Sequence, residues 1–166
     1  MKKNILIILF IITQLIGCKE NIETPSEIIT LDSSIENGIK GFDFQTGKII
    51  KYPNSDNIKP DLMVLVQMNS TEGLIGPYFT NIDLTQTFTL TDSFDDKETA
   101  EKYFDSYTSI SSGIYDSAAL NLKPYQIWTI KTNGKKFVKL LVLETMVGKD
   151  INEPYAEVTF RWYYLE

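Results

Sequence analysis

The sequence predicts a mainly β domain of antiparallel, sandwich-like sheets, with one short amphipathic helix and a C-terminal three-stranded meander. Three observations carry this prediction. Apolar and polar residues alternate in several segments, most extensively over residues 155–165, as in strands with one buried face. Asn133 and Gly134 separate two further strand-like segments and form the strongest two-residue hairpin signal. A helical spacing of apolar residues stands out over residues 93–107.

The first 17 residues are organised like a bacterial signal peptide. Lys2 and Lys3 form a basic head, and residues 5–12 are uniformly apolar. Thr13 and Gln14 interrupt this run, which therefore falls short of the roughly 20 apolar residues that a membrane-spanning helix needs. A buried core helix is the alternative, but residues 5–12 offer no polar face to solvent.

Cys18 is the only cysteine in the chain and directly follows this leader. Residues 15–18 resemble the lipobox of bacterial lipoproteins, in which a small residue precedes an invariant cysteine. The resemblance implies that the Cys18 thiol receives a diacylglycerol, that cleavage follows Gly17, and that the new amino terminus is acylated. An incidental cysteine after a conventional signal peptide is the alternative. At about 0.8 kcal/mol per buried methylene, several acyl chains anchor a protein durably, so we expect lipidation at Cys18 and a membrane tether.

Cleavage after residue 17 leaves 149 of the 166 residues, enough for one domain. Of 16 basic side chains Lys2 and Lys3 are lost, whereas all 22 acidic ones remain, so the mature formal charge is −8. Such a charge argues against a nucleic-acid partner. Lys19 occupies the position where an aspartate favours inner-membrane retention in some bacteria, so we expect the outer membrane, with the periplasmic or cell-surface face unresolved.

The mature chain divides into a tether, residues 18–37, and a β domain, residues 38–166. The tether is polar, although Ile28, Ile29 and Leu31 are compatible with a short strand.

Strands are expected on both sides of a turn at Thr46 and Gly47, in the continuous apolar run 62–66, and in the alternating segment 85–90. The run 62–66 has the composition of a strand covered on both faces.

Ser93 and Asp96 have the spacing of a capping box, so the helix is expected to start at Ser93. Its apolar side carries Phe94, Ala100, Tyr103, Phe104 and Tyr107. The densest acidic group of the chain, Asp92, Asp95, Asp96 and Glu98, lies at its start. Paired carboxylates can hydrolyse glycosides, but negative charge at a helix N-terminus is also favoured by the backbone dipole, and we prefer the second explanation.

The meander comprises residues 126–132, 135–144 and 155–165. A two-residue turn at Asn133 and Gly134 would pair Thr132 with Lys135, so that Ile130 faces Phe137 but Trp128 faces Lys139. Neither face of the hairpin would then be cleanly apolar, and we expect both faces to be partly covered.

The chain contains no histidine. This excludes Ser-His-Asp and Cys-His catalysis and imidazole-based zinc sites. With Cys18 lipidated, thiol chemistry is removed as well, and no glycine-rich phosphate loop is present. We therefore expect a protein that is not an enzyme.

The β region resembles the HmuY-like haem-binding lipoproteins over roughly residues 39–166. The resemblance rests on the leader, on residues 42–48, on the apolar strand 62–66, and on the aromatic segments 128–140 and 158–164. It implies an outer-membrane lipoprotein that captures haem and passes it to a partner receptor. The type member of that family binds iron with two histidines, which this chain lacks, and some relatives use methionine.

Methionine is therefore the candidate haem ligand. Met63 begins an apolar strand and is assigned to the core, whereas Met68 and Met146 lie at loop level and are the candidate cofactor-binding residues. The alternative is that both simply pack, as methionines in β domains commonly do.

The sequence thus favours a membrane-anchored, non-catalytic binding lipoprotein for haem or another hydrophobic ligand. The alternative is an interaction or structural subunit of an envelope complex without a small ligand.

Overall fold

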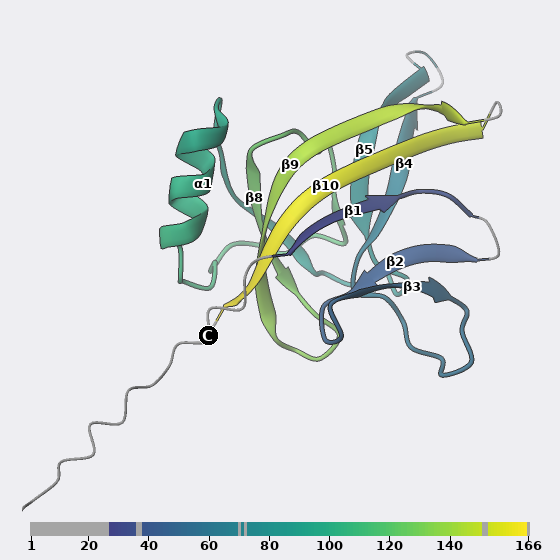
Figure 1. The fold of residues 1–166 in the computed structure, drawn as a ribbon, viewed down its shortest axis with the longest axis horizontal. Helices are drawn as coiled ribbons and strands as arrows, with labels where there is room; N and C mark the ends of the chain where they lie inside the picture. The colour runs from purple at the N-terminus through teal and green to yellow at the C-terminus, as the bar shows by residue number, and fades with distance from the viewer. Residues whose placement is uncertain (1–26, 36–37, 70, 72, 151–152, 166) are drawn as a thin grey trace, which may run out of the picture.

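The computed structural model describes residues 27–35, 38–69, 71, 73–150 and 153–165. The leader, Cys18 and most of the tether lie outside them. The described part contains ten strands and one helix, and all strand pairs are antiparallel (Figure 1). The predicted fold class, mainly β with one short helix, is confirmed.

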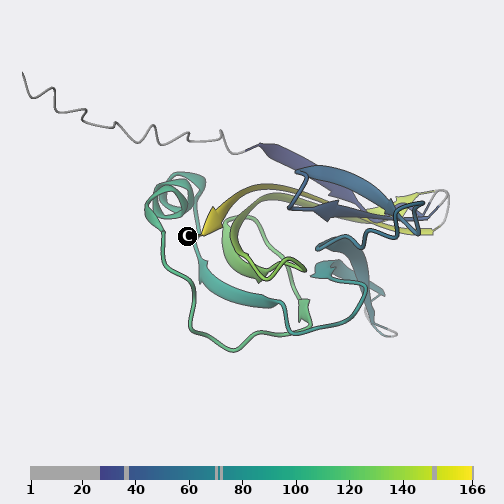
Figure 2. The ribbon, with the colours of Figure 1, turned by 90° about the horizontal axis from the view of Figure 1, so that it is seen from below.

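The largest sheet has five strands in the order β1-β10-β9-β8-β6 and curves around the core (Figure 2). β8, β9 and β10 follow one another in the chain and also lie side by side in the sheet, so the predicted C-terminal meander is confirmed. The strands are β1 (Ile28–Asp32), β6 (Phe88–Ser93), β8 (Gln126–Lys131), β9 (Phe137–Asp150) and β10 (Glu153–Leu165).

Two smaller sheets complete the fold. One pairs β2 (Ile39–Asp43) with β3 (Lys48–Tyr52), and the other has the order β4 (Met63–Asn69), β5 (Gly73–Thr80), β7 (Ala118–Ala119). A single bridge joins β2 to the residue before β4: the N–H of Phe42 donates to the carbonyl of Leu62 at 2.7 Å. A second bridge, Phe88 with Asp116, links β6 to the chain that leads into β7.

The main core lies between the sheets, and a smaller core lies under the helix. The main core contains the fully buried Phe42, Phe79 and Phe160. On the opposite face of β8 and β9, Ile127 and Leu141 pack against the helix α1 (Lys97–Ser106). Both faces of this hairpin are therefore covered, as predicted.

The predicted register of this hairpin is wrong by one residue. Lys135 adopts a left-handed conformation (φ 60°), and the N–H of Thr132 donates to the carbonyl of Lys136, so the connection has three residues rather than two. Trp128 consequently faces Leu140, and Ile130 faces Val138. A one-residue slip moves every side chain to the other face, and this register gives the main core an apolar wall.

The helix starts three residues later than predicted. Asp96, rather than Ser93, is the N-cap, and its carboxylate accepts from the Thr99 N–H at 2.9 Å. Ser93 is instead the last residue of β6. The predicted apolar face is confirmed: Ala100 and Phe104 are buried, with Phe94 and Tyr103 packed around them.

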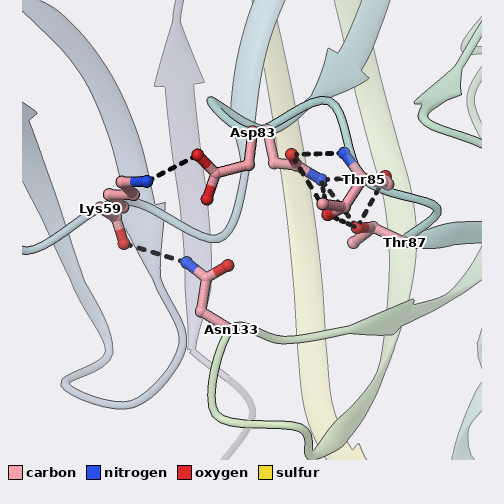
Figure 3. A network of polar contacts seen from close by, with 6 residues as sticks. Lys59, Asp83, Thr85, Thr87 and Asn133 are labelled. Carbon is pink, nitrogen blue, oxygen red and sulfur yellow. Dashed lines mark hydrogen bonds and ion pairs between the residues drawn. The ribbon is translucent and has the colours of Figure 1, made fainter.

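The short strand considered at Ile28, Ile29 and Leu31 is present, and another strand is shorter than expected. The first forms as β1, pairs with β10 from Ile28 to Asp32 and buries Leu31 completely, so this part of the predicted tether belongs to the sheet. The alternating segment 85–90 becomes a strand only from Phe88. Thr85 and Thr87 instead form a hydrogen-bonded loop with the buried Asn81 (Figure 3).

No helix within the described residues is long and apolar enough to span a bilayer.

Candidate ligand cleft

A hollow of about 940 Å³ lies where β4 faces the ends of β1 and β10. Among the described strands, β4 forms a ladder with β5 alone and β1 with β10 alone. The bridge at Phe42 and Leu62 holds β2 beside the start of β4, so beyond that point backbone pairing does not close the seam between the sheets. We refer to this hollow as the seam cleft.

The apolar wall of the seam cleft comes from β4, β5 and β10. Leu65, Val66 and Met68 project from β4, opposite Pro154 and Tyr155 at the start of β10. A bulge after Gln67 changes the pairing, so that Gln67 opposes Gly76 but Met68 opposes Leu74. The extra residue of this bulge is Ile75, on β5, and Met68, at the point where the register changes, is 61% exposed at the rim.

The other wall of the seam cleft is polar. The ammonium of Lys40 lies 2.9 Å from the Asp32 carboxylate, and the backbone N–H of Ser34 donates to the same carboxylate at 2.8 Å. Burial raises the pKa of Asp32, but the hydrogen bonds from Ser34 and Lys40 outweigh it, and the net pKa lies below the ordinary value. Asp32 therefore stays ionised, and its charge is matched by Lys40. Glu153 adds a second carboxylate on the β10 side.

A second hollow of about 430 Å³ adjoins the seam cleft. The two hollows share Leu65 and Tyr78. Beyond these residues, Ile39, Met63 and Leu84 line the second hollow, which we call the apolar annex. No charged side chain of the described residues lines it. Four described side chains with polar groups line it: Thr80 and Asn81, which hydrogen-bond to the neighbouring loop segments, and the tyrosines Tyr52 and Tyr78.

Of the two predicted haem ligands, one lines the seam cleft. Met68 is among its lining residues, whereas Met146 is on β9 opposite Glu157 and is not among them. Met63 is buried, as expected, and borders the apolar annex. Sequence reasoning missed Lys40, Tyr78 and Tyr155, because their convergence depends on how three sheets meet rather than on any local pattern.

The acidic group at the helix start has a structural role at Asp96, which caps α1 with both carboxylate oxygens engaged by Thr99. Within the part of the chain that the structure describes, no group of three or more His, Cys, Asp or Glu side chains could hold a metal ion.

A separate polar hollow of about 600 Å³ lies among the turns at one end of the molecule. Lys59 pairs with Asp83 at 2.6 Å, and its carbonyl accepts from the Asn133 side chain at 3.1 Å (Figure 3). The buried Asp61 accepts from the backbone N–H groups of Phe44 and Asn133. These groups hydrogen-bond to one another and connect adjacent turns. We therefore assign them a structural role rather than a role in ligand binding.

The comparisons with known proteins give no relative. No protein-family model, curated protein or solved structure matches this chain.

Proposed function

We propose that this protein is a lipid-anchored, non-catalytic binding lipoprotein of the bacterial outer membrane, and that it holds a hydrophobic small molecule in the seam cleft. The observation that carries the proposal is the cleft itself. Its volume of about 940 Å³, largely apolar lining and few convergent polar groups match the usual form of small-molecule sites.

The anchor rests on the lipobox-like residues 15–18. Mass spectrometry of the native protein from membranes tests it directly: the expected chain begins at Cys18 and carries acyl mass. An intact leader, or an unmodified Cys18, would refute both the anchor and the proposed location.

Haem is one candidate ligand, with Met68 as the axial ligand. The lining of the seam cleft includes one methionine, Met68. Haem ligation by both Met68 and Met146 would require a second methionine sulfur from outside this lining. We therefore propose the general function, capture of a hydrophobic ligand, with haem as a case to be tested and transfer to an outer-membrane receptor as its extension.

A matched pair of variants tests the cleft. Met68 and Met146 are 61% and 50% exposed, so replacing either by asparagine should leave the fold intact. Met68→Asn should weaken binding of the apolar dye Nile red several-fold, and Met146→Asn should not. Equal effects of the two variants, or no dye binding by the wild type, would contradict the proposal.

The same pair decides the haem question. Haemin should give a shifted Soret band that is lost with Met68→Asn alone if Met68 is the sole protein ligand. Loss with either variant would indicate ligation by both methionines. An unchanged haemin spectrum with the wild type would remove haem from the candidates.

The alternative, a subunit that docks an envelope complex, is favoured by one observation. One edge of β4 pairs with β5, whereas its other edge forms no ladder with any described strand. Open strand edges can accept a strand from a partner protein. A lysine at the rim, Met68→Lys, should then abolish co-purification of a partner from solubilised membranes. Recovery of the wild type alone would count against this alternative.

A further inference from the structure

The seam cleft and the apolar annex share the lining residues Leu65 and Tyr78. We infer that the two hollows form one elongated site, and that its ligand is a long-chain amphiphile with an uncharged or cationic head group: the chain lies in the annex, and the head lies at the polar wall of the seam cleft. The inference rests on the proposed function.

The first argument is continuity. Leu65 and Tyr78 border both hollows, so an apolar chain can pass from one to the other along the same side chains. Strands rise about 3.3 Å per residue, so the stretch of β4 from Met63 to Met68 spans roughly 16 Å. This is a length suited to an extended hydrocarbon chain rather than to a compact ligand.

The second argument is charge. Among the described residues, the charged side chains that line the seam cleft are Asp32, Lys40 and Glu153, which sum to a formal charge of −1. Lys40 is already engaged by Asp32 at 2.9 Å, so an anionic head group would meet the Glu153 carboxylate, and none of these described side chains would be a free cation for it. A neutral hydroxyl or an ammonium group avoids this repulsion.

The third argument is the chemistry of the annex. Thr80 and Asn81 direct their polar groups to adjacent loop segments, and the remaining lining is apolar apart from the hydroxyl groups of Tyr52 and Tyr78. With so few groups left to bind it, a polar group placed there would lose more hydration than it gains in new hydrogen bonds. Leu84, 67% exposed, lies at the mouth of the annex and can cover a bound chain.

Three ligands of equal chain length test the head group. Decanol, decylamine and decanoate, each below its aggregation concentration, are titrated against Nile red bound to the full protein. Decanol and decylamine should bind about tenfold or more tightly than decanoate. Glu153→Lys should reverse the order in favour of decanoate, and Glu144→Lys, an exposed carboxylate outside both hollows, should not.

Chain length tests the annex. Affinity should rise about fourfold for each methylene that becomes buried, so the hexyl compounds should bind far more weakly than the decyl compounds. Leu84→Asn should reduce this dependence on chain length, because it removes an apolar side chain from the lining of the annex. Asparagine is chosen because it tolerates the positive φ of 49° found there. Ile114→Asn, at an exposed residue outside both hollows, is the control.

The outcomes separate the two proposals. If neither the dye nor any amphiphile binds, the proposed function fails. If the dye binds but decanoate matches or exceeds decanol, or chain length has no effect, the proposed function stands and the ligand class is wrong.

Discussion

At the scale of single residues, Asp61 shows how one buried carboxylate can connect distant turns. It is 3% exposed, and its two oxygens accept from the N–H of Phe44 at 2.9 Å and of Asn133 at 2.5 Å. Burial raises the pKa of Asp61 above its ordinary value, the neighbouring Asp43 adds to the rise, and the two backbone hydrogen bonds only partly oppose it. Asp61 thus joins the β2–β3 turn to the β8–β9 turn at an electrostatic cost.

Asp61→Asn should destabilise the protein by about 1–3 kcal/mol, because the single amide oxygen of asparagine cannot replace both carboxylate oxygens that accept from Phe44 and Asn133. The wild-type advantage should be largest at acid pH. A raised folded-state pKa means that this contribution is complete below the ordinary aspartate pKa and declines as pH rises through the pKa of folded Asp61. Urea unfolding at several pH values measures both effects.

The control is Asp83→Asn, which removes an exposed partner of Lys59 and should cost less than about 1 kcal/mol. A wild-type advantage over Asp61→Asn that grows with pH would contradict the assigned direction of the pKa shift.

At the scale of elements, the single bridge between β2 and β4 depends on close backbone approach. A Cβ added at Gly41 would lie 2.4 Å from the Cβ of Pro60 and 2.7 Å from the carbonyl oxygen of Leu62. Glycine is therefore required beside the bridge from Phe42 to Leu62, which closes one end of the seam cleft.

Gly41→Ala should cost about 1–3 kcal/mol of unfolding free energy, since neither proline nor backbone can give way easily. Gly76→Ala, in β5, is the matched control: its Cβ would meet no atom within 4 Å, and its stability should be unchanged or slightly higher. Thermal or urea unfolding compares the two. Equal destabilisation would show that the close approach at Gly41 is not what matters.

The helix α1 is held by a lysine from the sheet below it. The helix has no basic residue in its last turn, and the buried ammonium of Lys139, on β9, donates to the carbonyls of Phe104 and Tyr107. It also lies 4.7 Å from the centre of the Phe104 ring. Lys139 thus supplies hydrogen bonds to carbonyls at the helix end, where intrahelical donors are lacking.

Lys139→Met should cost about 1–3 kcal/mol and should raise amide hydrogen exchange in α1 more than in β9. Lys102→Met, at an exposed position of the same helix, should leave both measurements nearly unchanged. Uniform loss of protection across the whole domain would argue against a specific role in holding the helix.

At the scale of the whole molecule, β1 connects the proposed anchor to the sheet. It begins at Ile28, ten residues after Cys18, and its far end at Asp32 forms the polar wall of the seam cleft. A chain of ten residues reaches at most roughly 33–36 Å. If Cys18 is lipidated, the cleft is therefore confined to the vicinity of the bilayer, where long-chain amphiphiles are concentrated.

If cleavage removes residues 1–17, Cys18→Ser should release the protein from membranes, since the chain from residue 18 onward has a formal charge of −8 and is not attracted to an anionic lipid surface. Fractionation of cells that express each form measures this, and folding of the variant is checked by circular dichroism. Retention of a folded Cys18→Ser variant in the membrane fraction would point to another anchor.

The β class, the C-terminal meander and the apolar face of the helix could be predicted from the sequence, which was also compatible with a strand at residues 28–32. Each of these depends on patterns within a few neighbouring residues, such as the alternation in β10. The tertiary structure decided the register of the β8–β9 hairpin, because a core wall of Trp128, Ile130, Val138 and Leu140 forms only with the three-residue connection. It also decided the cleft, the presence of Met68 but not Met146 in its lining, and the contact of Asp61 with Asn133, 72 residues away. These features depend on which strand edges meet and which remain open, and that is set by packing among segments distant in the chain.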